Sequence, residues 1–155
     1  MYIENSKTII VKIGSSLIID DKKIIRKKWL LEFAKDIKAL RKKNKNIIIV
    51  SSGAIALGCK KLNITKKKLK IDQSQAVASV GQIELMNLFK EVFAIQKINI
   101  SQILLTLEDT EIRRRAINAK RTIENLFNLN FIPIVNENDT IATSEIKYGD
   151  NDRLA

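Results

Sequence analysis

The chain has 155 residues, a length that suits one domain with a hydrophobic core and is short for two. Its formal net charge is +11, but the basic residues are scattered and only 5% of residues are aromatic, so nucleic acid is the less favoured partner. No apolar run approaches the roughly 20 residues of a membrane-spanning helix, and the single cysteine, Cys59, excludes a disulfide framework and favours the cytoplasm.

The chain contains no histidine. This excludes Ser-His and Cys-His mechanisms and removes the commonest general base. Any chemistry must therefore use lysine, carboxylate, amide and hydroxyl side chains, together with backbone N–H groups.

The first predicted strand covers residues 8–13 and ends in a Gly-Ser-Ser turn. Lys12 lies inside this apolar run, where an ammonium group is costly unless it faces a cleft or a partner. Successive N–H groups at Gly14 and Ser15 can form an anion-binding concavity, although the spacing is not that of a P-loop. The alternative interpretation is a strand with one outward lysine.

A helix is predicted over residues 24–43, followed by a buried strand over residues 46–50. The strand is followed by a Ser51-Ser52-Gly53 turn and then by a second helix. This strand, turn and helix repeat the first unit. We therefore expect the two turns to lie side by side at one edge of a parallel sheet.

Residues 60–70 read as a surface connection, and a long helix is predicted over residues 75–95 with Asp72 or Ser74 as its N-cap. Small residues early in this helix, including Ala78 and Gly81, favour close packing against another helix, with a dimer interface as the alternative.

A third strand is predicted over residues 98–106, then a helix capped by Thr106 or Asp109 that runs to about residue 128 with Arg113–115 on a solvated face. A fourth strand is predicted over residues 131–135 and an extended piece over 143–147. Asp150 is the predicted N-cap of a helix that begins at Asn151. Strands alternating with helices predict a single α/β domain with a mainly parallel sheet flanked by helices.

Two polar clusters follow the fourth strand: Asn136-Glu137-Asn138-Asp139 and Gly149-Asp150-Asn151-Asp152. Either cluster alone is typical of a turn. Two clusters within one connection, at the carboxyl edge of a parallel sheet, favour a site for a small polar molecule.

Five segments resemble, in order, the glutamate 5-kinases of the amino-acid kinase family: VKIGSS, IVSSGAIALG, QAVASVGQIELM, IPIVNENDTIA and EIKYGDNDRLA. The resemblance implies an αβα sandwich whose amino-terminal, glutamate-binding part is residues 1–155, without the carboxyl-terminal half and without a PUA domain. It also implies ATP-dependent phosphorylation of the γ-carboxylate of L-glutamate to glutamyl 5-phosphate, the first step of proline biosynthesis.

The resemblance assigns roles to matching positions. Lys12 would contact the transferred phosphoryl group, and Asp152 would orient the catalytic lysines. Gly14 and Ser15 would donate N–H groups to the phosphates of ATP, and Mg²⁺ would arrive with the nucleotide rather than on a metal site of this chain. The implied glutamate-binding residues are Ser52, Gly53, Ala54, Asp139 and Asn151.

This chemistry agrees with the composition, because a γ-carboxylate with a pKa of about 4.3 is already ionised and needs no general base. The resemblance further implies a homo-oligomer, with proline as a candidate feedback inhibitor. Alternatives are an inactive remnant that only binds glutamate or mediates oligomerisation, another carboxylate kinase of the same fold, and a basic nucleic-acid binder.

Overall fold

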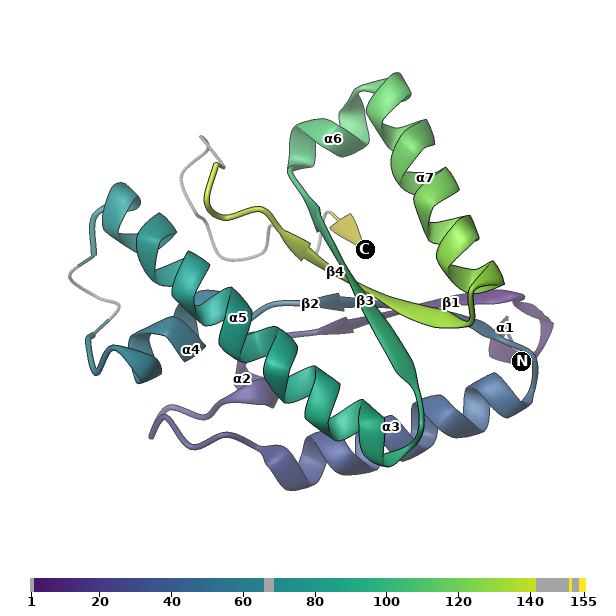
Figure 1. Cartoon of the computed structure of the whole chain (residues 1–155), viewed down its shortest axis with the longest axis horizontal. Helices are drawn as coiled ribbons and strands as arrows, with labels where there is room; N and C mark the ends of the chain where they lie inside the picture. Colours follow the sequence, from purple (N-terminus) through teal and green to yellow (C-terminus); the bar gives the residue numbers. More distant parts are fainter. Residues whose placement is uncertain (1, 66–68, 142–150, 152–153) are drawn as a thin grey trace.

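A parallel sheet forms the centre of the molecule (Figure 1). The computed structural model describes residues 2–65, 69–141, 151 and 154–155. Within these ranges the sheet has four strands in the order β1-β2-β4-β3, and every neighbouring pair is parallel. The strands are β1 (Thr8–Ile13), β2 (Asn46–Ser51), β3 (Asn99–Leu105) and β4 (Phe131–Glu137). Their carboxyl ends consequently meet at one edge, and the predicted α/β class is confirmed.

Helices cover both faces of the sheet. Figure 1 shows α3 and α5 beneath one face, with α2 and α4 beside them, and α7 across the other face. The helices are α1 (Tyr2–Asn5), α2 (Ser15–Ile18), α3 (Lys27–Lys42), α4 (Ala54–Lys61), α5 (Ile71–Ile95), α6 (Leu107–Glu111) and α7 (Arg113–Asn128). Among the described residues, none of these helices combines the length and apolar character needed to cross a membrane.

The main core lies between the sheet and the α3–α5 layer. Alternate strand residues such as Ile49 and Ile134 point into it and are fully buried, as are Leu30 of α3 and Phe89 of α5. Burying an aliphatic or aromatic side chain contributes about 1.5–3 kcal/mol, so this layer supplies most of the stability. By contrast, no residue of α7 is buried, and that helix contributes less buried apolar surface.

Several helices end in the same way, at a residue in the left-handed conformation. Asn44, Asn63, Lys97 and Asn130 follow α3, α4, α5 and α7 with φ between 54° and 66°. After α4, the Ile64 N–H donates to the Cys59 carbonyl at 2.9 Å, the pattern of a Schellman cap. Asparagine tolerates this conformation better than most residues. The predicted end of the first long helix near Asn44 is confirmed.

The starts of the helices were predicted less well. The helix expected over 24–43 begins at Lys27, because Ile19 and Ile25 form an isolated antiparallel bridge that holds the preceding turn. The helix expected over 75–95 begins at Ile71, so Asp72 and Ser74 are not its N-caps. Lys70 takes that position, and its N–H donates to Gln73 Oε1 at 3.0 Å.

The connections also differ from the predicted ones. Helix α4 extends to Lys61, so the surface connection predicted from residue 60 begins two residues later. The single helix expected after residue 106 is broken at Ile112, whose extended backbone separates α6 from α7. Arg113–115 are exposed at the start of α7, as expected. The predicted extended piece 143–147 and the cap Asp150 lie outside the described residues.

Strand β4 contains the largest difference from the predicted fold. It continues through Asn136 and Glu137, which are only 1% and 6% exposed. The sequence had placed both residues in a solvated polar cluster beyond the strand. They remain in the strand because β3 pairs with β4 through Leu104 opposite Asn136 and Leu105 opposite Glu137.

Helices α4 and α5 approach closely at two glycines. A Cβ atom at Gly81 of α5 would fall on the Ala54 carbonyl oxygen and the Gly58 N–H group, and one at Gly58 would fall on the Val77 carbonyl oxygen. The small residues early in the long helix therefore serve close packing against another helix, as expected.

We expect Gly81→Ala to destabilise the protein. Alanine in a helix interior is ordinarily more favourable than glycine by about 1 kcal/mol. Here the added methyl group overlaps the backbone of α4, so we expect a loss of about 1–3 kcal/mol in the free energy of unfolding, measured in urea. The control Ser79→Ala, exposed on the same helix, should change stability by less than about 0.5 kcal/mol. A Gly81→Ala protein at least as stable as the wild type would contradict this packing.

A capping interaction begins α6. Thr106 N–H donates to Asp109 Oδ2 at 2.7 Å, and Thr106 Oγ1 accepts from the Asp109 N–H at 3.4 Å. The prediction that Thr106 or Asp109 caps this helix is confirmed. These hydrogen bonds, first that from the Thr106 backbone, lower the pKa of the Asp109 carboxyl.

Because its pKa is lower in the folded state, Asp109 contributes stability above its unfolded pKa of about 3.9 and loses that contribution as pH falls through the folded value. We expect the stability difference between wild type and Asp109→Asn to be constant from pH 7 to about pH 5 and to shrink below about pH 4. Urea unfolding at a series of pH values measures it, and a difference independent of pH would be the contrary result.

Candidate active site

The turns after β1 and β2 lie side by side, as the sequence predicted. The Ser52 N–H donates to the Ile13 carbonyl at 3.0 Å and so joins the two strand ends. Gly53 packs directly on the first turn, because a Cβ atom there would lie 3.3 Å from Ile18 Cδ1 and 3.8 Å from Ser15 Cα. The carboxyl edge of the sheet therefore brings together two segments that are about 40 residues apart in sequence.

Gly53 allows the chain to turn from β2 straight into α4. Its φ of 115° is in the region that side-chain-bearing residues rarely adopt, and its carbonyl accepts the Leu57 N–H at 2.9 Å. Helix α4 then starts at buried Ala54. The first N–H groups of a helix have no partner within it and carry partial positive charge, so this end of α4 favours an anionic group beside Ser52.

A chain of side-chain amides lies at the same edge. Asn151 Nδ2 donates to Ser52 Oγ at 3.0 Å and to Asn136 Oδ1 at 3.2 Å. Asn136 Nδ2 donates to Gln82 Oε1 at 2.7 Å. The Glu137 N–H donates to Asn151 Oδ1 at 3.1 Å. We call Gln82, Asn136 and Asn151 the amide relay, and it joins α5, β4 and the last described residues to the turn after β2.

The relay leaves Ser52 with a defined hydrogen-bonding capacity. Its Oγ accepts from Asn151, so its O–H is available as a donor. A hydroxyl donor beside the amino-terminal end of α4 suits a carboxylate or phosphate oxygen. The arrangement can therefore hold a small anionic molecule at the mouth of the sheet.

The predicted phosphate-binding residues lie next to this arrangement. Gly14 is extended, with φ −73° and ψ 156°, and Ser15 begins the single turn of α2. Lys12 is exposed and alternates with the core-facing residues Val11 and Ile13 of β1. It therefore lies on the sheet face opposite the main core, as the outward-lysine interpretation expects, and three residues before Ser15, which lies beside Gly53.

The predicted acidic residues are placed less fully. Asp139 is half-buried two residues beyond β4, in a turn where the Ile141 N–H donates to the Asn138 carbonyl at 3.2 Å. It shares the carboxyl edge with Ser52 and Asn151. Asp152 lies outside the described residues.

Sequence reasoning missed two members of the site. Asn136 was expected in a turn cluster, and its burial was not anticipated. Gln82 is one of several polar residues on α5, and nothing in the periodicity of that helix distinguishes it. A buried asparagine at the end of an apolar strand needs partners, and that requirement was the available indication for both residues.

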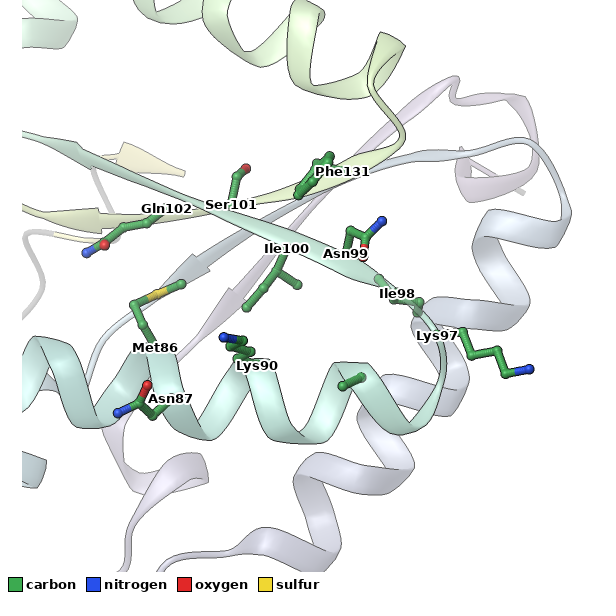
Figure 2. Close-up of a pocket in the computed structure, with 11 residues that line it drawn as sticks. Met86, Asn87, Lys90, Lys97, Ile98, Asn99, Ile100, Ser101, Gln102 and Phe131 are labelled. Atoms are coloured by element: carbon green, nitrogen blue, oxygen red, sulfur yellow. The ribbon is translucent and has the colours of Figure 1, made fainter.

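A hollow of about 530 Å³ lies between α5 and β3. Figure 2 shows Met86 of α5 and Ile100 of β3 facing each other across it, while Lys97 points away. The hollow borders the amino-terminal half of β3, from Asn99 to Gln102. It is therefore displaced from the carboxyl edge where the polar groups gather, and we place the candidate site at that edge.

The fold and this edge define a parallel α/β protein whose polar side chains and helix start gather at the carboxyl ends of its strands, where ligands bind in open α/β sheets. Residues 7–155 match the model of the Amino acid kinase family, and the chain belongs to that family.

Two curated relatives that match nearly the whole chain carry the same name. The chain is 78% identical over 155 residues to a protein named glutamate 5-kinase from Pelagibacter ubique, and 49% identical over 154 residues to one of that name from Ruegeria sp.. These alignments cover 100% and 99% of this chain, and 42% of each relative's length.

Solved structures support the fold. Giardia carbamate kinase matches 84% of this chain and 60% of its own length, with a TM-score of 0.55 and 10% identity. Isopentenyl phosphate kinase of T. acidophilum matches 84% of this chain and 54% of its own, with a TM-score of 0.55 and 11% identity. Both likenesses concern the arrangement of strands and helices, which confirms the predicted family fold.

The hydrogen bond between Ser52 and Asn151 can be measured by a double-mutant cycle. We expect Ser52→Ala and Asn151→Ala to be coupled by about 0.5–1.5 kcal/mol in the free energy of unfolding, the usual contribution of one hydrogen bond. Ser52→Ala combined with Ser79→Ala is the control and should be additive. Additivity of the Ser52 and Asn151 changes as well would mean that the two side chains do not interact.

Proposed function

We propose that residues 1–155 are the glutamate-binding, amino-terminal part of a glutamate 5-kinase, an enzyme that phosphorylates the γ-carboxylate of L-glutamate with ATP in proline biosynthesis. The 78% identity to the Pelagibacter protein of that name supports the assignment. On this proposal the chain is part of one amino-acid kinase domain and carries the acceptor site.

The observation that carries the proposal is the Ser52–Asn151 contact at the amino-terminal end of α4. Ser52, the N–H groups at Gly53 and Ala54, and the partial positive charge of the helix would together bind one carboxylate of glutamate. Asp139, at the same edge, is suited to the α-ammonium group. A dicarboxylic amino acid presents both kinds of charge, which favours it over a simple anion.

The phosphates of ATP would lie over the neighbouring turn. Gly14 and Ser15 would donate N–H groups to them, and Lys12 would supply positive charge to the transferred phosphoryl group. These groups fit an anion because the first N–H groups of a helical turn lack internal acceptors. ATP supplies the phosphoryl group, and its Mg²⁺ neutralises charge on the phosphates. Asp152 would orient the catalytic lysines.

The transfer needs little proton chemistry. An oxygen of the γ-carboxylate attacks the γ-phosphorus of ATP, the bond from that phosphorus to the ADP oxygen breaks, and glutamyl 5-phosphate and ADP form. The nucleophile is ionised at neutral pH. The protein's contribution is therefore alignment and positive charge, which lysine and backbone N–H groups supply without histidine.

Two partners follow from the same assignment. We propose that the protein works as a homo-oligomer and that proline acts as a feedback inhibitor.

The second candidate function is glutamate binding without turnover by the 155 residues alone. The Ser52–Asn151 contact at the start of α4 favours it, because that contact belongs to the proposed acceptor site and not to the phosphate turn.

Calorimetric titration and an assay of ADP production test the proposal together. We expect the 155-residue chain to bind L-glutamate saturably and to form ADP slowly or not at all. Ser52→Ala removes the hydroxyl donor and should weaken glutamate binding by about tenfold, as loss of one hydrogen bond to a charged group does. Ser79→Ala is the matched control and should bind as the wild type does.

Absence of saturable glutamate binding to the folded wild-type chain would contradict the acceptor assignment. Rapid glutamate-dependent ADP production by the same chain would instead contradict the expectation that these residues do not suffice for turnover.

A further inference from the structure

We propose that Gln82 is a positioning residue: it holds the Asn136 amide in the orientation that accepts from Asn151, so that Asn151 keeps its contact with Ser52 and the Ser52 hydroxyl faces the acidic ligand. The inference rests on the proposed glutamate site. It concerns a residue on α5 that lies 54 positions from Asn136 in the sequence and contacts it through one hydrogen bond of 2.7 Å.

The direction of the relay begins at a backbone group. The Glu137 N–H can only donate, so the atom of Asn151 that faces it must be the carbonyl oxygen. Both N–H bonds of the Asn151 amide are then directed to Ser52 Oγ and Asn136 Oδ1. This leaves the Nδ2 group of Asn136 toward α5, where it requires an acceptor.

Gln82 Oε1 is that acceptor. The orientation leaves Gln82 Nε2 buried and without an acceptor among the described residues. An unpaired buried N–H group costs about 1–3 kcal/mol. Turning the Gln82 amide over would not remove that cost, because its NH₂ group would then face the NH₂ group of Asn136 and both donors would lack an acceptor. The unpaired N–H group therefore stays on Gln82, at the end of the relay away from Ser52. The direction of the hydrogen bond from Asn151 to Ser52 is preserved.

Without an acceptor at position 82, the buried Nδ2 group of Asn136 would be unpaired, and only the 3.2 Å hydrogen bond from Asn151 would hold the amide in its orientation. If its amide turned over, its NH₂ group would face the NH₂ group of Asn151, and Asn151 would lose one of its two acceptors. The contact between Asn151 and Ser52 would weaken, and the Ser52 hydroxyl would be free to rotate away from the ligand. Gln82 thus acts on the ligand through Asn136 and Asn151 and does not itself touch it.

The test compares Gln82→Met and Gln82→Glu in the 155-residue chain. Methionine fills similar space and has no strong acceptor, whereas the glutamate carboxylate accepts from Asn136 as Gln82 does. The direct readout is hydrogen exchange of the Asn151 side-chain NH₂ group, followed by NMR. The second readout is the dissociation constant for L-glutamate, and urea unfolding reports overall stability separately. Asn87→Ala, exposed on the same helix, is the control.

We expect the Asn151 NH₂ protons to be protected in wild type, Asn87→Ala and Gln82→Glu. In Gln82→Met they should exchange about tenfold faster, and glutamate should bind about tenfold more weakly, as the loss of one hydrogen bond implies. Unchanged protection and affinity in Gln82→Met would overturn the inference. If Gln82→Met does not fold, Gln82→Glu decides: retained protection supports the inference and lost protection overturns it.

The outcomes separate this inference from the proposed function. A wild-type chain with protected Asn151 protons but no glutamate binding would contradict the function alone. A wild-type chain that binds glutamate, with Gln82→Met indistinguishable from it, would contradict the role of Gln82 alone.

Discussion

The close approach of α5 to the start of α4 is the constraint on which the candidate site depends. Gly81 lies against the Ala54 carbonyl, with no room for a side chain, and the next residue, Gln82, reaches Asn136 at the end of β4. A larger residue at 81 would move α5 outward, lengthen that hydrogen bond and shift the helix end beside Ser52. Packing between two helices and polar geometry at the sheet edge are thus set by adjacent residues of one helix.

The close approach of α5 also brings a hydrogen-bond partner to a polar side chain buried at the end of β4. Asn136 is 1% exposed at the end of an otherwise apolar strand, and such burial is unfavourable unless partners are present. Gln82 and Asn151 supply those partners from elements far apart in sequence. Side-chain amides whose hydrogen bonds are made are held in one orientation. A site needs such fixed groups to present one hydroxyl and several N–H groups to a small ligand.

Much of the fold could be predicted from local sequence. Apolar β-branched runs located the four strands, and Ser-Ser-Gly marked the turn into α4. Helix starts at Lys27 and Ile71 were not found, because a bridge between Ile19 and Ile25 and a backbone cap at Lys70 leave no residue-type pattern. The contact of Gln82 with Asn136 could not be found either, since hydrogen bonds across 54 residues follow from the packed structure. The family resemblance named Ser52 and Asn151, and the structure places them in contact.

An NMR titration of the 155-residue chain with L-glutamate tests the account most directly. The account predicts saturable shifts confined to the carboxyl edge, at the backbone amides of Gly53 and Ala54 and the side-chain amide of Asn151. Saturable shifts centred instead on the hollow between α5 and β3, at Met86 and Ser101, or no shifts from a folded chain, would contradict it.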